Sequence, residues 1–262
     1  MKAGCLLFVL WLALPCAGAV EGEINLPTIK PEGQLAQALR GIDRIHQRLE
    51  TLAADVTQIK TSALLAEPVV SNGRLRYRKP SRIRWDYQPP DAMVLLIADG
   101  ELTAYYPDLE RADVVDVRRY QQRLLRVMGI GQSTEMLQRD YEIEFAGRIL
   151  PDASAPEQLI PLELRGENPP RPMPTGRLTV LDLEPRRRRL ERRIERIRIW
   201  LDEATWLPRM MRLAEGRGDA SLVIFRSIEP NAELSDDAFE LDLPDSVEIT
   251  RRASTGAVEA AP

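Results

Sequence analysis

The sequence has few residues that could form a disulfide, a thiol nucleophile or a metal site. Its two cysteines, Cys5 and Cys16, both lie near the amino terminus, and His46 is its only histidine. His46 has no second histidine or acidic cluster beside it in the sequence, and no serine stands in a G-x-S-x-G elbow. The sequence therefore predicts no catalytic residue, no metal ion and no cofactor, and we do not expect an enzyme.

Long hydrophobic runs are also missing, apart from a short one at the amino terminus. Lys2 precedes an apolar stretch at 6–14, Pro15 breaks it, and Ala17-Gly18-Ala19 forms an A-x-A cleavage site. This order is typical of a secretory signal peptide, and the stretch is shorter than the roughly 20 residues that cross a bilayer. We expect a cleaved signal at 1–19; an uncleaved signal anchor is the alternative. Pro15 before Cys16 is unlike a lipoprotein processing site.

An excess of positive charge is absent as well. Removal of Lys2 with the signal would leave 35 of the 36 basic residues against 40 acidic ones, a net charge of about −5. Nucleic-acid binding depends on neutralising phosphates, so this balance argues against nucleic acid as the main partner. Both cysteines would leave with the signal, so the mature chain must be stabilised by its core rather than by disulfides.

After a flexible leader at 20–32, we expect one domain over 33–250 and a disordered tail at 251–262. Apolar residues recur with helical spacing over 33–52, which predicts a helix with one apolar stripe. From Ala54 the period changes to two: Leu75 and Tyr77 alternate with arginines, as do Ile83, Trp85 and Tyr87. One apolar and one polar face is typical of an antiparallel sheet.

Turn residues divide the remainder into further short elements. Asp99-Gly100 predicts a tight hairpin between strands at 93–98 and 102–106, and a strand at 113–117 follows. Short helices are expected at 120–128 and after Ser133. Later strands are expected at 141–149, 159–164, 192–201, 207–214 and 220–228, and a last one through Phe239, Leu241 and Leu243.

Three stretches, in this order, resemble the LolA-like outer-membrane lipoprotein carriers. The first is 73–90, which reads GRLRYRKPSRIRWDYQPP and is similar to that family's "G-x-L … R-P … R-x-x-W-x-Y … P" strand pair. The second is Ile97-Ala98-Asp99-Gly100 followed by Tyr105-Tyr106-Pro107. The third begins at Trp200-Leu201-Asp202 and Leu207-Pro208 and runs through Gly218-Asp219 to Pro244. Their order and spacing carry the resemblance, which spans about 33–250.

The resemblance implies a mainly β (α+β) fold: a strongly curved, half-open antiparallel β-barrel covered by a few helices, with a hydrophobic cavity for acyl chains. Aromatic and aliphatic residues on the apolar strand faces are the candidates for lining it. They are Leu75, Tyr77, Ile83, Trp85, Tyr87, Leu95, Ile97 and Tyr105, where Tyr106 is an alternative to Tyr105. Cavity-lining and core residues look alike in sequence, so a purely structural role for each of them stays open.

In that family, helices of the carrier itself fill the cavity and compete with cargo. The candidates for such a lid are Leu124, Leu125, Met128, Met136 and Leu137. The family also has an arginine before the strand-breaking proline that holds the lid closed. Lys79 stands at this position here, and a lysine lacks the planar fork of donors that an arginine offers. The latch is therefore expected to differ in this chain.

A dense basic run includes Arg186, Arg187, Arg188 and Arg189. It predicts either a solvated hairpin with charges on its outer face or a docking surface for an anionic membrane, an acidic partner or a lipid headgroup.

Together these features predict a monomeric periplasmic carrier of acylated lipoproteins or a related amphiphile. It would receive cargo from an inner-membrane exporter and deliver it to an outer-membrane acceptor. Two other functions are compatible with the same fold: an envelope-stress sensor domain that binds a partner protein, and an enzyme that works by shaping its pocket.

Overall fold

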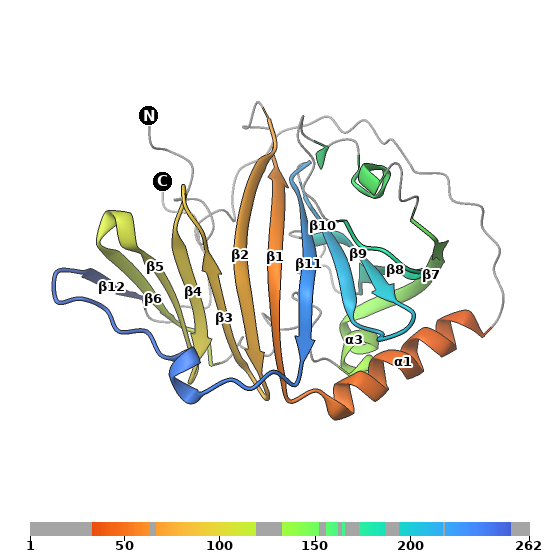
Figure 1. Cartoon of the computed structure of the whole chain (residues 1–262), viewed down its shortest axis with the longest axis horizontal. Helices are drawn as coiled ribbons and strands as arrows, with labels where there is room; N and C mark the ends of the chain where they lie inside the picture. Colours follow the sequence, from red (N-terminus) through yellow and green to blue (C-terminus); the bar gives the residue numbers. More distant parts are fainter. Residues whose placement is uncertain are drawn as a thin grey trace.

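Residues 33–62, 67–118, 133–151, 156–161, 164–165, 173–186, 194–216 and 218–252 are described by the structure, a computed structural model. The described strands form one twelve-stranded sheet (Figure 1). The strands are β1 (Thr51–Thr61), β2 (Val69–Arg78), β3 (Arg82–Tyr87), β4 (Met93–Ala98), β5 (Glu101–Tyr106), β6 (Arg111–Asp116), β7 (Tyr141–Ile149), β8 (Leu178–Pro185), β9 (Ile194–Asp202), β10 (Pro208–Glu215), β11 (Ala220–Pro230) and β12 (Glu248–Arg252). The α-helices are α1 (Gln34–Arg48) and α3 (Thr134–Asp140), and single 3-10 turns form η1 (Pro107–Leu109), η2 (Pro156–Leu159) and η4 (Asp236–Phe239). Within the described residues, neither helix is long and apolar enough to cross a membrane.

The strand order is β12-β6-β5-β4-β3-β2-β1-β11-β10-β9-β8-β7. Neighbours are antiparallel except β12, which pairs with β6 in parallel. The pairing of β1 with β11 joins the amino-terminal meander to the later strands. The predicted mainly β fold is therefore confirmed. The order has two edges, β12 and β7, so the described strands form an open sheet. The expectation of a purely antiparallel sheet is wrong at β12, whose parallel pairing with β6 makes the sheet mixed.

The alternation of side chains along β2 and β3 divides the sheet into two faces. Leu75 and Tyr77 are buried beside half-buried or exposed arginines, and Ile83, Trp85 and Tyr87 alternate with Arg82, Arg84 and Asp86 in the same way. We call the face that packs against α1 the inner face and the opposite one the outer face. The predicted outward orientation of the arginines is confirmed.

Helix α1 closes one end of the inner face beside β7 and α3 (Figure 1). Its apolar stripe packs on the inner cluster through four partly buried residues, Leu35, Leu39, Ile42 and Ile45. The Asp43 carboxylate accepts hydrogen bonds from the backbone N–H of Thr134, at 2.9 Å, and from its hydroxyl, at 2.6 Å. These two bonds join α1 to the start of α3.

A second apolar cluster lies on the outer face of β8–β11 and β1. Its sheet residues include Ile59, Trp200 and Leu222, and residues of the segment before β8 cover them, among them Leu159 and Leu164. The strand expected at 159–164 is wrong. Pro156 begins the 3-10 turn η2 and the Leu164 N–H donates to the Pro161 carbonyl, so this proline-rich segment turns over the sheet instead of joining it.

The carboxyl-terminal segment differs from expectation too. The strand expected through Phe239, Leu241 and Leu243 is wrong: Phe239 ends η4 and is buried, whereas the two leucines lie in an irregular segment. The last strand is β12. The chain after β11 runs past the lower ends of β1 to β3 in Figure 1, forms η4 and then reaches the β6 edge.

Candidate functional site

The inner face of β2 to β5 carries an apolar surface built from rows of cross-strand neighbours. One row pairs Ala54, Leu75, Trp85, Leu95 and Ala104 across five strands. All five side chains belong to the inner cluster and none is more than 7% exposed. Because paired residues on one face of a sheet touch each other, the row forms a continuous apolar strip across the sheet.

A second row lies beside the first, nearer the turn that follows β2. It pairs Leu52, Tyr77, Ile83, Ile97 and Leu102. Burial raises the pKa of the Tyr77 phenol to about 12, with a smaller contribution from the Glu50 carboxylate. Tyr77 is therefore neutral at physiological pH and acts as part of an apolar wall.

The structure brings together seven of the eight sequence-predicted cavity residues on this surface. They are Leu75, Tyr77, Ile83, Trp85, Tyr87, Leu95 and Ile97. Tyr105 is the exception, because β5 begins at Glu101 and places Leu102, Ala104 and Tyr106 on the inner face. Tyr106, the alternative at this position, is the tyrosine that belongs to the cluster.

A small group of polar atoms lies inside this apolar surface. The rings of Trp85 and Tyr87 stack with centroids 5.0 Å apart and planes 4° from parallel. The Tyr87 hydroxyl donates to the Gln58 side-chain oxygen at 3.0 Å, in a buried position. The indole N–H of Trp85 is buried and has no acceptor among the described residues. A buried donor without a partner costs roughly 1–3 kcal/mol, so an acceptor supplied by a ligand would be favourable here.

Gly73 makes room for this arrangement. A Cβ atom at this position would lie 3.0 Å from the Trp85 indole nitrogen and 2.4 Å from the Asp86 carbonyl oxygen. Only glycine lets β2 approach the β3 backbone and the indole this closely.

The row that contains Ala104 ends at β6 in an ion pair, whereas the row that contains Leu102 continues on β6 with Val115. Asp113 is paired with Ala104 in the register and therefore lies on the same face. Its carboxylate accepts from the Arg111 guanidinium at 2.8 Å, and both the hydrogen bond and the charge of Asp113 raise the pKa of Arg111. Along the row of Ala104, the inner surface thus changes from apolar on β5 to charged on the neighbouring strand β6.

Residues 47–148 match the family model described as outer membrane lipoprotein carrier protein LolA. This match confirms the predicted family resemblance. The matched segment contains β1 to β6 and β7 up to Arg148, and therefore both rows of the apolar surface described above. No curated protein sequence matches the chain.

Solved structures resemble the fold as well. An uncharacterised conserved protein from Thermus thermophilus superposes with a TM-score of 0.50 at 10% identity, over 84% of this chain and 100% of that one. MucB, in the MucA/MucB complex of Pseudomonas aeruginosa, gives 0.44 at 13% identity, over 79% and 61%. A LolA-superfamily protein from Nitrosomonas europaea gives 0.37 at 10% identity, over 79% and 97%. At these identities the similarity concerns the fold alone.

Of the predicted lid residues, only Met136 and Leu137 of α3 lie within the described part of the chain; Leu124, Leu125 and Met128 lie outside it. Leu137 is buried in the inner cluster and Met136 is half-buried. The helix expected after Ser133 is confirmed, and the Ser133 hydroxyl caps it by accepting from the Met136 N–H at 3.3 Å. Helix α3 therefore contributes to the apolar surface from the side of β7.

Lys79, at the position of the predicted latch, lies at the end of β2 beside the end of α1. Its ammonium group is 3.2 Å from the Glu50 carboxylate, and its backbone N–H donates to the Glu50 carbonyl at 2.9 Å. Lys79 is thus joined to the short link between α1 and β1.

Of the predicted docking arginines, Arg187, Arg188 and Arg189 lie outside the described residues. Arg186 donates to the Tyr141 carbonyl at 3.0 Å and lies 3.9 Å from the Glu142 carboxylate. On β9, Arg198 makes a two-point contact with Asp182 at 2.7 Å. The described part of this basic region is therefore paired with acids of the neighbouring strands.

Sequence reasoning missed a polar hollow of about 540 Å³ where the β2–β3 and β4–β5 turns meet. Its basic residues come from the β2–β3 turn with its flanking strand ends and from the segment after β6, and the β4–β5 turn adds Asp99 and Gly100. Only the register shows that these two turns are adjacent. Within the described ranges, no group of three or more histidine, cysteine or acidic residues could hold a metal ion.

Proposed function

We propose that this protein is a carrier that shelters the acyl chains of lipoproteins, or of a related amphiphile, on the inner face of β2 to β5. The observation that carries the proposal is the buried apolar surface with an indole N–H at Trp85 that has no acceptor among the residues that the structure describes. The match of 47–148 to the lipoprotein-carrier family supports it. No covalent chemistry and no cofactor are part of the proposed activity.

The energetics of acyl binding suit such a surface. Each CH₂ group moved from water to an apolar site gains about 0.8 kcal/mol, so a sixteen-carbon chain gains on the order of 10 kcal/mol before costs. The ester or amide carbonyl that joins an acyl chain to its head group is a hydrogen-bond acceptor. We propose that the Trp85 N–H donates to this carbonyl while the chain lies along the rows of Leu75 and Tyr77.

Release of cargo requires a competing occupant. We propose that lid residues fill the same surface when cargo leaves: Leu124, Leu125, Met128, Met136 and Leu137. Met136 and Met128 suit this role because methionine adapts to irregular apolar surroundings. Lys79 would act at the adjacent end of the sheet, where its contact with Glu50 connects β2 to the end of α1.

The proposal includes the setting of the carrier. The signal at 1–19 would direct it to the periplasm as a monomer, and the sheet would curve as a half-open barrel around its cargo. An inner-membrane exporter would supply cargo and an outer-membrane acceptor would remove it.

Binding of a synthetic diacylated lipopeptide tests the proposal. The mature protein is titrated with the lipopeptide, and bound lipopeptide is detected by native mass spectrometry. Trp85→Phe keeps an aromatic ring and removes only the N–H donor, so we expect binding to weaken roughly 5- to 10-fold, the equivalent of one hydrogen bond.

Trp200→Phe is the matched control, because Trp200 is buried in the outer cluster and belongs to neither row. We expect lipopeptide affinity to stay within twofold of the wild type. Failure of the wild-type protein to bind the lipopeptide would rule out the carrier function.

A further inference from the structure

The polar hollow lies at the opposite side of the β2–β3 strand pair from the apolar rows, at the end of the sheet where two turns meet. Nine residues line it: Arg78, Lys79, Pro80, Ser81, Arg82, Asp99, Gly100, Arg118 and Asp236. Four of these side chains are cationic and two are anionic. The hollow is therefore a basic site on a chain whose overall charge is negative.

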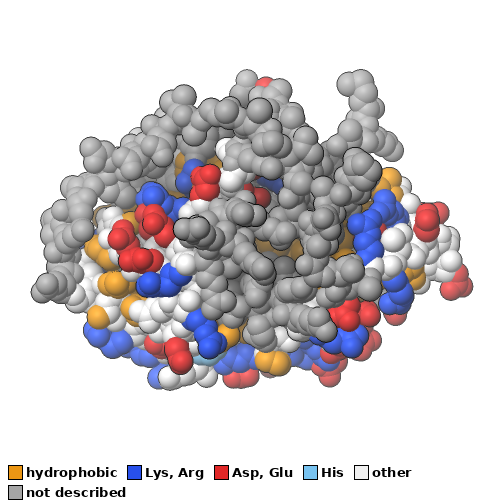
Figure 2. All heavy atoms as spheres, turned by 180° about the vertical axis from the view of Figure 1, so that it is seen from behind, with side chains coloured by type: hydrophobic (Ala, Val, Ile, Leu, Met, Phe, Trp, Pro, Cys, Tyr) orange, Lys and Arg blue, Asp and Glu red, His pale blue; other side chains and the backbone are white. Residues whose placement is uncertain are grey.

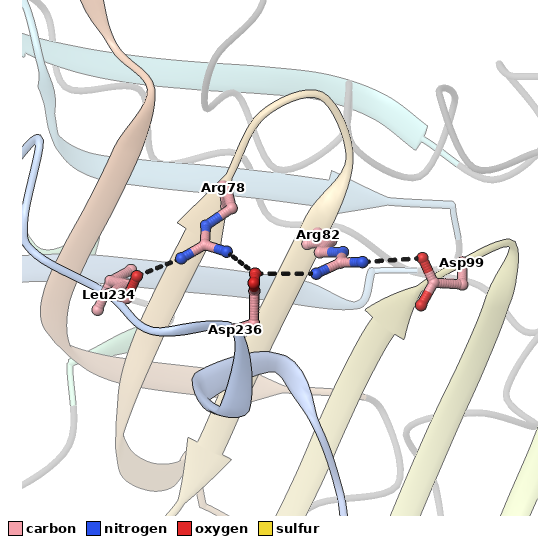
Figure 3. Close-up of polar contacts among 5 residues, drawn as sticks. All are labelled: Arg78, Arg82, Asp99, Leu234 and Asp236. Atoms are coloured by element: carbon pink, nitrogen blue, oxygen red, sulfur yellow. Dashed lines mark hydrogen bonds and ion pairs between the residues drawn. The ribbon is translucent and has the colours of Figure 1, made fainter.

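Two arginines share one carboxylate in this hollow (Figure 3). The Arg78 guanidinium pairs with Asp236 and also donates to the Leu234 carbonyl. The Arg82 guanidinium lies 3.5 Å from the same Asp236 carboxylate and 3.2 Å from Asp99. Asp236 thus occupies a point on which two guanidinium groups converge.

The two arginines are held in place by contacts of their own. The Arg78 guanidinium lies 5.1 Å from the centroid of the Phe239 ring, which is buried. The side chains of Arg78 and Arg82 are only 23% and 34% exposed, whereas that of Asp236 is 74% exposed. The cations are therefore fixed and partly shielded from water, and the carboxylate between them is the exposed member of the group.

The other two cations, Lys79 and Arg118, are paired with acids that lie outside the hollow. Lys79 pairs with Glu50 and Arg118 with Asp116 at 3.4 Å, and neither acid lines the hollow. Arg118 also packs against Gly100, where a Cβ atom would lie 2.2 Å from the Arg118 Cγ. Figure 2, which views the molecule from behind, shows cationic and anionic side chains intermingled along its lower edge.

We propose that this hollow binds a phosphate ester, and that Asp236 competes with it for Arg78 and Arg82. A phosphate group carries more negative charge than a carboxylate and has three acceptor oxygens. Arginine forks bind phosphate oxygens in pairs, and these charge-assisted bonds are stronger than neutral ones. This site is separate from the apolar rows and does not depend on the proposed acyl binding.

Calorimetric titration with glycerol 3-phosphate and with inorganic phosphate tests the proposal at one fixed ionic strength. Arg82→Gln removes one of the two converging guanidinium groups, so we expect about 10-fold weaker binding. Asp236→Asn removes the competing charge, and we expect several-fold tighter binding. Because these two changes act in opposite directions, a general loss of folding cannot produce both.

Arg196→Gln is the matched control. Arg196 is exposed, pairs with Glu184 on β8 and lies five strands away from β3 in the sheet order, so its loss removes the same charge far from the hollow. We expect its affinity for phosphate to stay within twofold of the wild type. Equal weakening in Arg196→Gln and Arg82→Gln would show a nonspecific charge effect and overturn the proposal.

Co-sedimentation with phosphatidylglycerol vesicles distinguishes the source of the phosphate. Saturable binding of glycerol 3-phosphate, with the expected order of variants, indicates a soluble phosphate ester as ligand. Binding to the vesicles alone, with the same order of variants, indicates a lipid headgroup. No saturable binding in either assay, vesicle binding that survives Arg82→Gln, or weaker binding by Asp236→Asn would each overturn the proposal.

Discussion

Replacement of Gly41 in α1 tests how closely this helix is packed on the sheet. In an ordinary helix interior, changing glycine to alanine stabilises a protein by about 1 kcal/mol, because glycine has the lower helix propensity. Gly41 is buried against the indole of Trp206, in the turn between β9 and β10. An added Cβ would lie 2.2 Å from Cδ2 and 2.4 Å from Cγ of that ring.

The helix and the ring would have to separate by roughly 1 Å to restore an ordinary contact of about 3.5 Å. Overpacking of this kind costs roughly 1–3 kcal/mol, which outweighs the gain in helix propensity. We expect Gly41→Ala to lower the free energy of unfolding by up to roughly 2 kcal/mol, the overpacking cost less the gain in helix propensity. Urea unfolding followed by circular dichroism measures this difference.

A double-mutant cycle identifies the cause. In a Trp206→Ala background the ring is gone, so Gly41→Ala should regain its normal effect and stabilise the protein by up to about 1 kcal/mol. If Gly41→Ala stabilises the protein that retains Trp206, the close packing of α1 on this turn is refuted.

Three further changes test other contacts. Asp43→Ala should cost roughly 1–3 kcal/mol in urea unfolding because two donors of Thr134 lose their acceptor; an unchanged midpoint would contradict the link between α1 and α3. Phe239→Ala should lower the free energy of unfolding by roughly 3–5 kcal/mol because Phe239 is buried. It should also release Arg78, which packs on the Phe239 ring, and so speed proteolysis of the carboxyl-terminal segment; proteolysis as slow as that of the wild type would contradict this contact. In the unfolded chain the Tyr77 phenol has a pKa near 10, and burial raises it to about 12 in the folded protein. As the pH rises through this window, the free energy of unfolding should fall by up to about 1.4 kcal/mol per pH unit, and Tyr77→Phe should reduce that slope.

The sequence predicted the elements with strong periodicity. The alternation in 73–78 and 82–87 and the Asp99-Gly100 turn led to β3, β4 and β5 close to their observed bounds and to the part of β2 that follows Asn72. The apolar residues of 73–78 and 82–87 all lie on one face, which made these two segments readable. The same alternation could not choose between Tyr105 and Tyr106, because both are aromatic and the register depends on where β5 begins.

Other elements depended on contacts between distant segments. The apolar residues of 159–164 look like a strand, but they cover the outer face of β8 to β11, which only the folded sheet reveals. Strand β12 is polar and short, and its pairing with β6 arises because the chain after η4 passes that edge. The polar hollow was missed for the same reason, since Asp236 lies far along the sequence from Arg78 and Arg82.

The two halves of the sheet differ in their outer faces. Strands β8 to β11 carry apolar residues on both faces, and the outer ones are covered by Leu159 and Leu164. Strands β2 and β3 instead place arginines and Asp86 on the outer face, where Arg84 pairs with Asp86 at 2.9 Å. Ion pairs near the surface, such as this partly buried one, contribute little to stability, so β8 to β11 have the larger share of the hydrophobic stabilisation. Because β8 to β11 are stabilised from both sides, the fold depends less on the inner face of β2 to β5, and this inner face is where the proposed binding and release of an acyl chain would exchange contacts.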